Sequence, residues 1–205
     1  MNAVAAELAK YGRMLWERGL ASGTGGNISA RDGAHMWVKP GHGALGELTA
    51  QDYVAVDIAS GVPRGTRRPS SEFKMHLAIY RVRPDVQAVF HTHSPWATGA
   101  ASSRLGFEPI VIEAVGYLGR IATLPYYLTS SQDLADAVGR AARERDTILL
   151  MNHGVVLLGP DPRAAFQRCE IIEESAKALV AARILGGPRR ISSARIAELR
   201  NLGKK

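Results

Sequence analysis

Residues 147–158 read TILLMNHGVVLL and place two apolar, strand-length runs almost end to end. The strands predicted at 147–151 and 154–158 leave no room for the helix that a parallel crossover needs, so they should pair antiparallel. Further strands are predicted at 35–39, 53–57, 85–93, 109–113 and 121–124. Several of these are also close together in the chain, so the sheet should be largely antiparallel or mixed.

Helices with apolar residues at helical spacing alternate with these strands. In the helix predicted over 2–19, Val4, Leu8, Tyr11 and Leu15 recur at that spacing. The other helices are predicted at 72–82, at 131–144, from Asp161 to 186–188, and at 192–202. Helices and strands that are interspersed along 205 residues predict a single α/β domain.

The charge and the composition bear on partners and location. A net charge of +7 suits either nucleic acid or small anionic metabolites. The basic residues are scattered and do not interleave with aromatic ones, so nucleic acid is not the expected partner. No apolar run is long enough to cross a membrane, and Glu7 and Lys10 make the N-terminus unlike a secretory signal. With Cys169 as the only cysteine, no internal disulfide is available, and we expect a cytoplasmic protein.

The stretch VFHTHSP contains two histidines, His91 and His93, at the end of a predicted strand. Side chains alternate along a strand, so both imidazoles point to one face and can chelate one ion. His153 follows another apolar strand and precedes a glycine. Three histidines with one open position are typical of catalytic zinc sites. The residues alone leave a second interpretation open, in which these histidines are only the polar ends of strands.

Glu72 follows two serines, Ser70 and Ser71, at the predicted start of a helix. Serine hydroxyls and the N–H groups of a helix N-terminus can together form an anion site. The alternative is an ordinary helix that the serines cap and whose dipole the acid favours. His76 falls on the apolar face of the same helix, and we interpret it as a core histidine rather than a ligand.

Taken in order, the segments SGTGGNIS, PSSEFKMHLAIYRVRPDVQAVFHTHSP and NHGVV resemble the class II aldolase/adducin family, nearest to its sugar-phosphate aldolases. The resemblance covers residues 4–185. It implies a three-layer α/β/α sandwich around a mostly antiparallel central sheet, and a homotetramer with active sites at subunit interfaces. We therefore place a class II aldolase/adducin-like domain at 1–188, and a short C-terminal helix with a basic tail at 189–205.

The same resemblance implies roles for single residues. His91, His93 and His153 would be ligands of a zinc ion, which manganese or cobalt can replace. Glu72 would be the catalytic acid/base. The substrate phosphate would be held by Gly26, Asn27, Ser70 and Ser71. The implied reaction is retro-aldol cleavage of a small ketose phosphate, in which the metal stabilises an enediolate and Glu72 moves a proton beside it.

The loop KPGHG, Lys39 to Gly43, departs from the family pattern, in which T-P-S-G is usual when the substrate is phosphorylated. Gly41 stands in place of the serine, and His42 in place of the glycine. Either His42 and Lys39 supply replacement phosphate donors, or the substrate is a carboxylate or an aromatic acid. Some relatives are decarboxylases, and the same metal chemistry would serve them. In a third interpretation, His42 only faces solvent in a turn.

The C-terminal part offers no obvious proton donor, because no histidine follows His153 and no tyrosine follows Tyr127. The aldolase and 4-epimerase branches use such groups, so the departure weakens an epimerase function most. We take Tyr117, in VGYLG, as the candidate donor from a neighbouring subunit; a packed aromatic residue is the alternative. We therefore take an aldolase as the first function and a decarboxylase on the same scaffold as the alternative. Glu72 and the three candidate ligands argue against a binding or scaffold protein.

Overall fold

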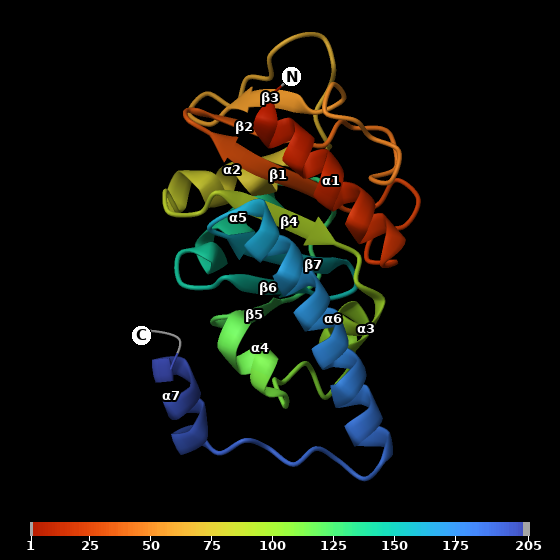
Figure 1. Ribbon diagram of the computed structural model, residues 1–205, viewed down its shortest axis with the longest axis vertical. Helices are drawn as coiled ribbons and strands as arrows, with labels where there is room; N and C mark the ends of the chain where they lie inside the picture. The colour runs from red at the N-terminus through yellow and green to blue at the C-terminus, as the bar shows by residue number, and fades with distance from the viewer. Residues whose placement is uncertain (1, 203–205) are drawn as a thin grey trace.

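The computed structural model describes residues 2–202 and contains a seven-stranded sheet with helices on both faces (Figure 1). The strands are β1 (Asn27–Asp32), β2 (His35–Val38), β3 (Val54–Asp57), β4 (Ala88–Thr92), β5 (Ile121–Leu124), β6 (Thr147–Leu150) and β7 (Gly154–Gly159). Their order across the sheet is β3-β2-β1-β4-β7-β6-β5. Among the strand pairs of residues 2–202, only β5 with β6 is parallel. The predicted α/β fold with a mostly antiparallel sheet is therefore confirmed.

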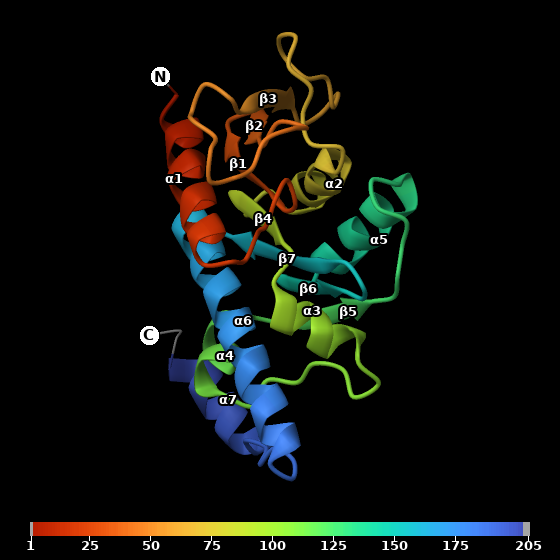
Figure 2. The same cartoon turned by 90° about the vertical axis from the view of Figure 1, so that its right-hand side faces the viewer.

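Each face of the sheet has its own layer of helices, with α1 and α6 on one side and α2 and α5 on the other (Figure 2). The helices are α1 (Ala3–Glu17), α2 (Phe73–Val82), α3 (Pro95–Ser102), α4 (Ile112–Tyr117), α5 (Gln132–Ala142), α6 (Pro162–Ile184) and α7 (Ser193–Leu202). Phe90 and Leu157 belong to the core under α1 and α6, whereas their neighbours Val89 and Val156 belong to the core under α2 and α5. Because successive side chains of a strand point to opposite faces, β4 and β7 are buried on both sides.

Capping residues explain where several helices begin and end. Asn2, Ser131 and Asp161 each accept a hydrogen bond from a backbone N–H in the first turn of α1, α5 and α6 respectively. Gly19 follows α1 with φ of +69°, a conformation that glycine adopts without strain. The predicted C-terminal helix is present as α7. The end of the predicted basic tail, 203–205, lies outside the described residues.

Three features differ from the sequence predictions. No strand forms at 109–113; Val111 packs against the core beside α6, and the chain then enters α4. Strand β1 was not among the predicted strands; it begins at Asn27, inside the glycine-rich SGTGGNIS segment, and pairs with β2 and β4. Glu72, rather than a serine, occupies the N-cap position of α2, and it makes no side-chain capping bond. Ser70 instead closes a turn in which its carbonyl accepts from the N–H of Phe73.

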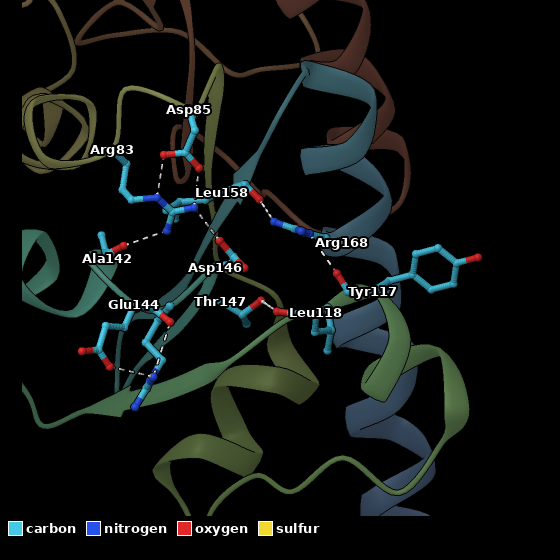
Figure 3. A network of polar contacts seen from close by, with 11 residues as sticks. Arg83, Asp85, Tyr117, Leu118, Ala142, Glu144, Asp146, Thr147, Leu158 and Arg168 are labelled. Carbon is cyan, nitrogen blue, oxygen red and sulfur yellow. Dashed lines mark hydrogen bonds and ion pairs between the residues drawn. The ribbon is translucent and has the colours of Figure 1, made fainter. Parts of the chain in front are cut away.

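A polar network fixes the part of the sheet beside α4 (Figure 3). Arg83 donates to Asp85 at 2.8 Å and to Asp146 at 3.0 Å. Arg168, from α6, donates to the backbone carbonyl of Tyr117 at 2.9 Å and to a carbonyl of β7. The Arg168 side chain therefore links the end of α4 to α6 and β7. Within residues 2–202, no helix is long and apolar enough to span a membrane.

Candidate metal centre

Four side chains converge where β4 ends and β7 begins. Glu72, His91, His93 and His153 each offer a ligand atom, and these atoms all lie within 4.8 Å of one another. His91 is in β4, His93 follows it directly, His153 lies in the turn before β7, and Glu72 precedes α2. Since β4 and β7 pair antiparallel, the end of one strand and the turn before the other must meet. The topology thus brings together the four residues that the sequence singled out.

The imidazoles are arranged as a metal would require. The Nε2 atoms of His91 and His93 are 3.2 Å apart, and two nitrogens bonded to one tetrahedral zinc lie about 3.3 Å apart. His91 is fully buried, and its Nδ1 is 3.0 Å from the carbonyl oxygen of Val155. Donation from Nδ1 to that carbonyl leaves Nε2 as a free lone pair for a ligand bond. The ring centroids of His153 lie 4.8 and 5.5 Å from those of His91 and His93. This donor set fits a divalent ion of the zinc type.

The buried setting controls the charges of the cluster. Burial, together with the charges of His91 and His153, lowers the pKa of His93 to about 4. Burial alone would raise the pKa of Glu72, but the imidazoles of His153 and His91 beside its two oxygens outweigh that effect and hold the pKa well below the usual range. The site therefore favours a neutral His93 and an ionised Glu72, which are the forms that coordinate a cation.

Both oxygens of the Glu72 carboxylate accept a hydrogen bond. Asn27 Nδ2 donates to Oε2 at 2.9 Å, and Thr129 Oγ1 donates to Oε1 at 2.9 Å. The Nε2 atoms of His91 and His153 lie 3.3 Å from Oε2 and Oε1 respectively. Thr129 was not predicted, because it lies in an irregular segment before α5 that carries no motif. Asn27 was predicted as a phosphate ligand, and the structure places its side chain against the acid.

Glycines let the backbone come close to these ligands. A Cβ on Gly25 would lie 2.8 Å from Nδ1 of His93, and one on Gly154 would lie 2.4 Å from the carbonyl oxygen of Thr92. Gly26 has φ of +70°, and a Cβ there would lie 3.0 Å from the carbonyl oxygen of His91. The loop and the turn can therefore touch the metal centre only because these positions lack side chains.

The KPGHG loop lies against the segment that leads into α2. Its Lys39 carbonyl accepts from the N–H of Ser70 at 2.8 Å. The Lys39 side chain is buried, and its Nζ donates to the Thr24 carbonyl at 3.1 Å. Burial lowers the pKa of this ammonium group, although Glu72 opposes the shift. His42 is exposed in the turn. The loop is thus next to the site, with a buried cation under the glycine-rich segment.

The remaining candidates occupy separate places. Ser70 is buried, whereas Ser71 is exposed and its hydroxyl accepts from that of Ser130 at 2.9 Å. Tyr117 is 62% exposed on α4, and its ring points away from the polar network of Figure 3. Neither Tyr117 nor His42 belongs to the four-residue group. A role for Tyr117 from a neighbouring subunit stays a prediction.

Comparison with known proteins places this chain among relatives of two activities. Residues 6–180 match the family model of the Class II Aldolase and Adducin N-terminal domain. The chain is 36% identical over 171 residues to the L-fuculose phosphate aldolase of Methanocaldococcus jannaschii, covering 83% of this chain and 92% of that protein. It is 32% identical over 178 residues to the 3-oxo-tetronate 4-phosphate decarboxylase of Pectobacterium atrosepticum, covering 84% and 81%.

The fold also matches that of a solved structure. An L-fuculose 1-phosphate aldolase superposes with a TM-score of 0.91 at 30% identity, over the whole of this chain and 98% of that one. The agreement extends over all three layers of the sandwich.

Proposed function

The chain belongs to the class II aldolase and adducin family, and we propose that it is a metal-dependent carbon–carbon lyase that cleaves a small ketose phosphate. The reaction would be reversible retro-aldol cleavage of a substrate of the fuculose 1-phosphate type, giving dihydroxyacetone phosphate and an aldehyde. The convergence of Glu72 with His91, His93 and His153 is the observation that supports this proposal most directly.

Each residue of the site has a separate role in the proposed reaction. His91, His93 and His153 would hold a divalent ion, which would supply Lewis-acid stabilisation of the negative charge that develops on the substrate. Glu72 moves a proton next to that charge: in the cleavage direction it protonates the carbon that keeps the electrons of the broken bond. Tyr117 of a neighbouring subunit is our candidate for the second proton transfer, at the hydroxyl group that becomes the aldehyde.

We assign the substrate's phosphate to the loop before β1 and the turn before α2. Ser70 and Ser71 offer hydroxyls, and Gly26 offers backbone that no side chain blocks. The Asn27 amide gives one N–H to Glu72 and keeps a second for a ligand. We include His42 in this binding wall, because its loop lies against the same turn.

Zinc is the proposed metal, with manganese or cobalt as substitutes. We also propose a cytoplasmic homotetramer whose active sites lie at subunit interfaces. Large apolar side chains that are exposed on this chain support an interface. They include Trp96, Ile112, Ile184 and Leu185.

A decarboxylase on the same scaffold is the second candidate. The KPGHG loop favours it, since Gly41 cannot offer the hydroxyl that family members with phosphorylated substrates use. A relative with 3-oxo-tetronate 4-phosphate decarboxylase activity adds support. Loss of carbon dioxide from a keto or hydroxy acid, or from an aromatic acid, would leave the same kind of charge beside the metal.

A metal-replete activity screen separates the two functions. The protein would be incubated with ketose phosphates and with keto and hydroxy acids, while aldehyde and carbon dioxide are measured. We expect aldehyde release, and a 100- to 10,000-fold lower kcat, roughly, for Glu72→Gln at unchanged metal content. Carbon dioxide release without aldehyde would favour the decarboxylase. Less than about 0.2 metal ions per chain after gentle purification would count against both, because each needs the three-histidine site.

A further inference from the structure

A chain of buried, uncharged side chains leads from the core to Glu72. His76 Nε2 is 2.6 Å from Asn27 Oδ1, and His76 Nδ1 is 2.7 Å from Ser29 Oγ. Ser29 Oγ is in turn 2.9 Å from the hydroxyl of Tyr80. All four side chains are at least 97% buried. The chain ends at Asn27 Nδ2, which donates to the Glu72 carboxylate at 2.9 Å.

The direction of every hydrogen bond follows from the charge of Glu72. An ionised carboxylate only accepts, so Asn27 must turn its NH₂ group towards Glu72 and its Oδ1 towards His76. His76 must then carry its proton on Nε2. Burial lowers the pKa of His76 to about 3, so the ring has one proton, and Nδ1 accepts. Ser29 therefore donates to Nδ1, and Tyr80 donates to Ser29.

This order leaves one orientation for the Asn27 amide. If the amide flipped, its NH₂ group would face the Nε2–H of His76 and its oxygen would face a carboxylate. Two buried donors would then oppose each other, and two acceptors would do the same, which is strongly unfavourable among buried side chains. Ser29 and Asn27 lie two positions apart on β1, so their side chains share one face and can hold His76 together.

We propose that His76 is a positioning residue for Glu72. By donating to Asn27, it holds the amide that fixes carboxylate oxygen Oε2 beside the imidazole of His91. The hydrogen bonds of the His76 ring go to Ser29 and Asn27 and not to the three candidate metal ligands. The proposal rests on the proposed function of Glu72 as the proton-transfer group, and it adds a buried histidine that the family resemblance did not assign.

Two isosteres separate the positioning role from a packing role. The amide of glutamine can reach the place of Nε2, so His76→Gln keeps the donor to Asn27. Asparagine reaches only the place of Nδ1, so His76→Asn keeps the contact with Ser29 and loses that donor. Tyr80→Phe is the control for core disruption, because it removes a buried hydroxyl from the same helix and leaves the donor of His76 in place.

The expected results concern kcat and metal affinity. His76→Asn should lower kcat by about 10- to 100-fold, the range seen when a group that orients a metal-site residue is lost. KM should change less than kcat, because Asn27 supplies only part of the proposed phosphate contact and those of Ser70, Ser71 and Gly26 are untouched. The affinity of the metal-free protein for Co²⁺ should fall by about 10-fold. His76→Gln should keep at least about a third of the wild-type kcat and Co²⁺ affinity.

The proposal is wrong if His76→Asn has the same kcat and Co²⁺ affinity as the wild type, or if His76→Asn and His76→Gln lose these two quantities equally. It is also wrong if Tyr80→Phe loses kcat and Co²⁺ affinity as well, in step with its fall in Tm. A long-range ¹H–¹⁵N spectrum of the wild type gives a test that needs no variant to fold. It should show the Nε2–H tautomer of His76, and the Nδ1–H tautomer would refute the order of donors. If the wild type acts on none of the screened substrates, the proposed function fails, while Co²⁺ affinity and the tautomer still decide the role of His76.

Discussion

Replacing Gly154 with alanine tests how closely β7 must approach the metal centre. The added Cβ would lie 2.4 Å from the Thr92 carbonyl oxygen and 3.0 Å from Cε1 of His91. An ordinary contact between carbon and a carbonyl oxygen is about 3.3 Å, so one of the two strands must move by about 0.9 Å. Thr92 pairs with Val155, whose carbonyl orients His91. The movement therefore strains both the strand pairing and the ligand.

The expected size of the effect follows from these contacts. Overpacking of a buried site costs about 1–3 kcal/mol, so we expect the free energy of unfolding of Gly154→Ala to fall by about 2 kcal/mol. Disturbing the group that orients a metal ligand typically costs about 10- to 100-fold in affinity or activity. The Co²⁺ affinity and kcat of Gly154→Ala should both fall by that factor.

Urea unfolding of the metal-free protein and a Co²⁺ titration measure the two effects. Gly99→Ala is the matched control: it adds the same methyl group to an exposed position of α3, where no atom lies within 4 Å of the new Cβ. This change should raise stability by up to about 1 kcal/mol and leave metal affinity unchanged. The reasoning is wrong if Gly154→Ala unfolds within about 0.5 kcal/mol of the wild type and binds Co²⁺ as tightly.

Three further predictions follow from other parts of the structure. Burial lowers the pKa of His76 from 6.5 to about 3, so between these values the unfolded chain takes up a proton that the folded chain does not. The titration of His76 should therefore remove about 2 kcal/mol of the metal-free protein's free energy of unfolding between pH 7 and pH 5, in addition to any loss from His93. In urea unfolding, His76→Gln should flatten the slope of stability against pH, and an unchanged slope would contradict the assignment. Removing the metal with a chelator should lower Tm, and added Zn²⁺ should restore it, with a stabilisation that rises with the logarithm of the Zn²⁺ concentration above Kd; an unchanged Tm would contradict a metal site in the folded state. Asp161→Ala should cost about 1 kcal/mol of stability through the lost N-cap of α6, with kcat unchanged; a fall in kcat would show that α6 positions the site.

The sequence is most informative where chemistry and topology coincide. His91 and His93 follow from the alternation of a strand, and the turn that carries His153 follows from two strands too close for a crossover. Antiparallel pairing of β4 with β7 then brings the three histidines together. Glu72 lies beside the three histidines because it directly precedes α2, and α2 packs on one face of β4 and β7.

The sequence is least informative where the signal depends on tertiary neighbours. Strand β1 is not evident in the sequence, because it follows a glycine-rich segment and its pairing with β4, rather than its composition, stabilises it. The apolar residues Ile110 and Val111 favour a strand, but they pack against the core just before α4 instead of pairing. Thr129 lies in no periodic segment, and only its contact with Glu72 reveals a role. His76 is buried as predicted, but its partners Asn27 and Ser29 become visible only in the fold.

Anomalous diffraction from crystals of the zinc-loaded protein tests the central claim most directly. The account predicts a single strong peak at the zinc edge, bonded to Nε2 of His91 at about 2.0–2.1 Å and equally close to a ring nitrogen of His93 and of His153. The peak should disappear in His91→Ala crystals soaked in the same way. A peak at any other place, or none at the meeting point of the three imidazoles, would contradict the assignment of this cluster as the metal centre.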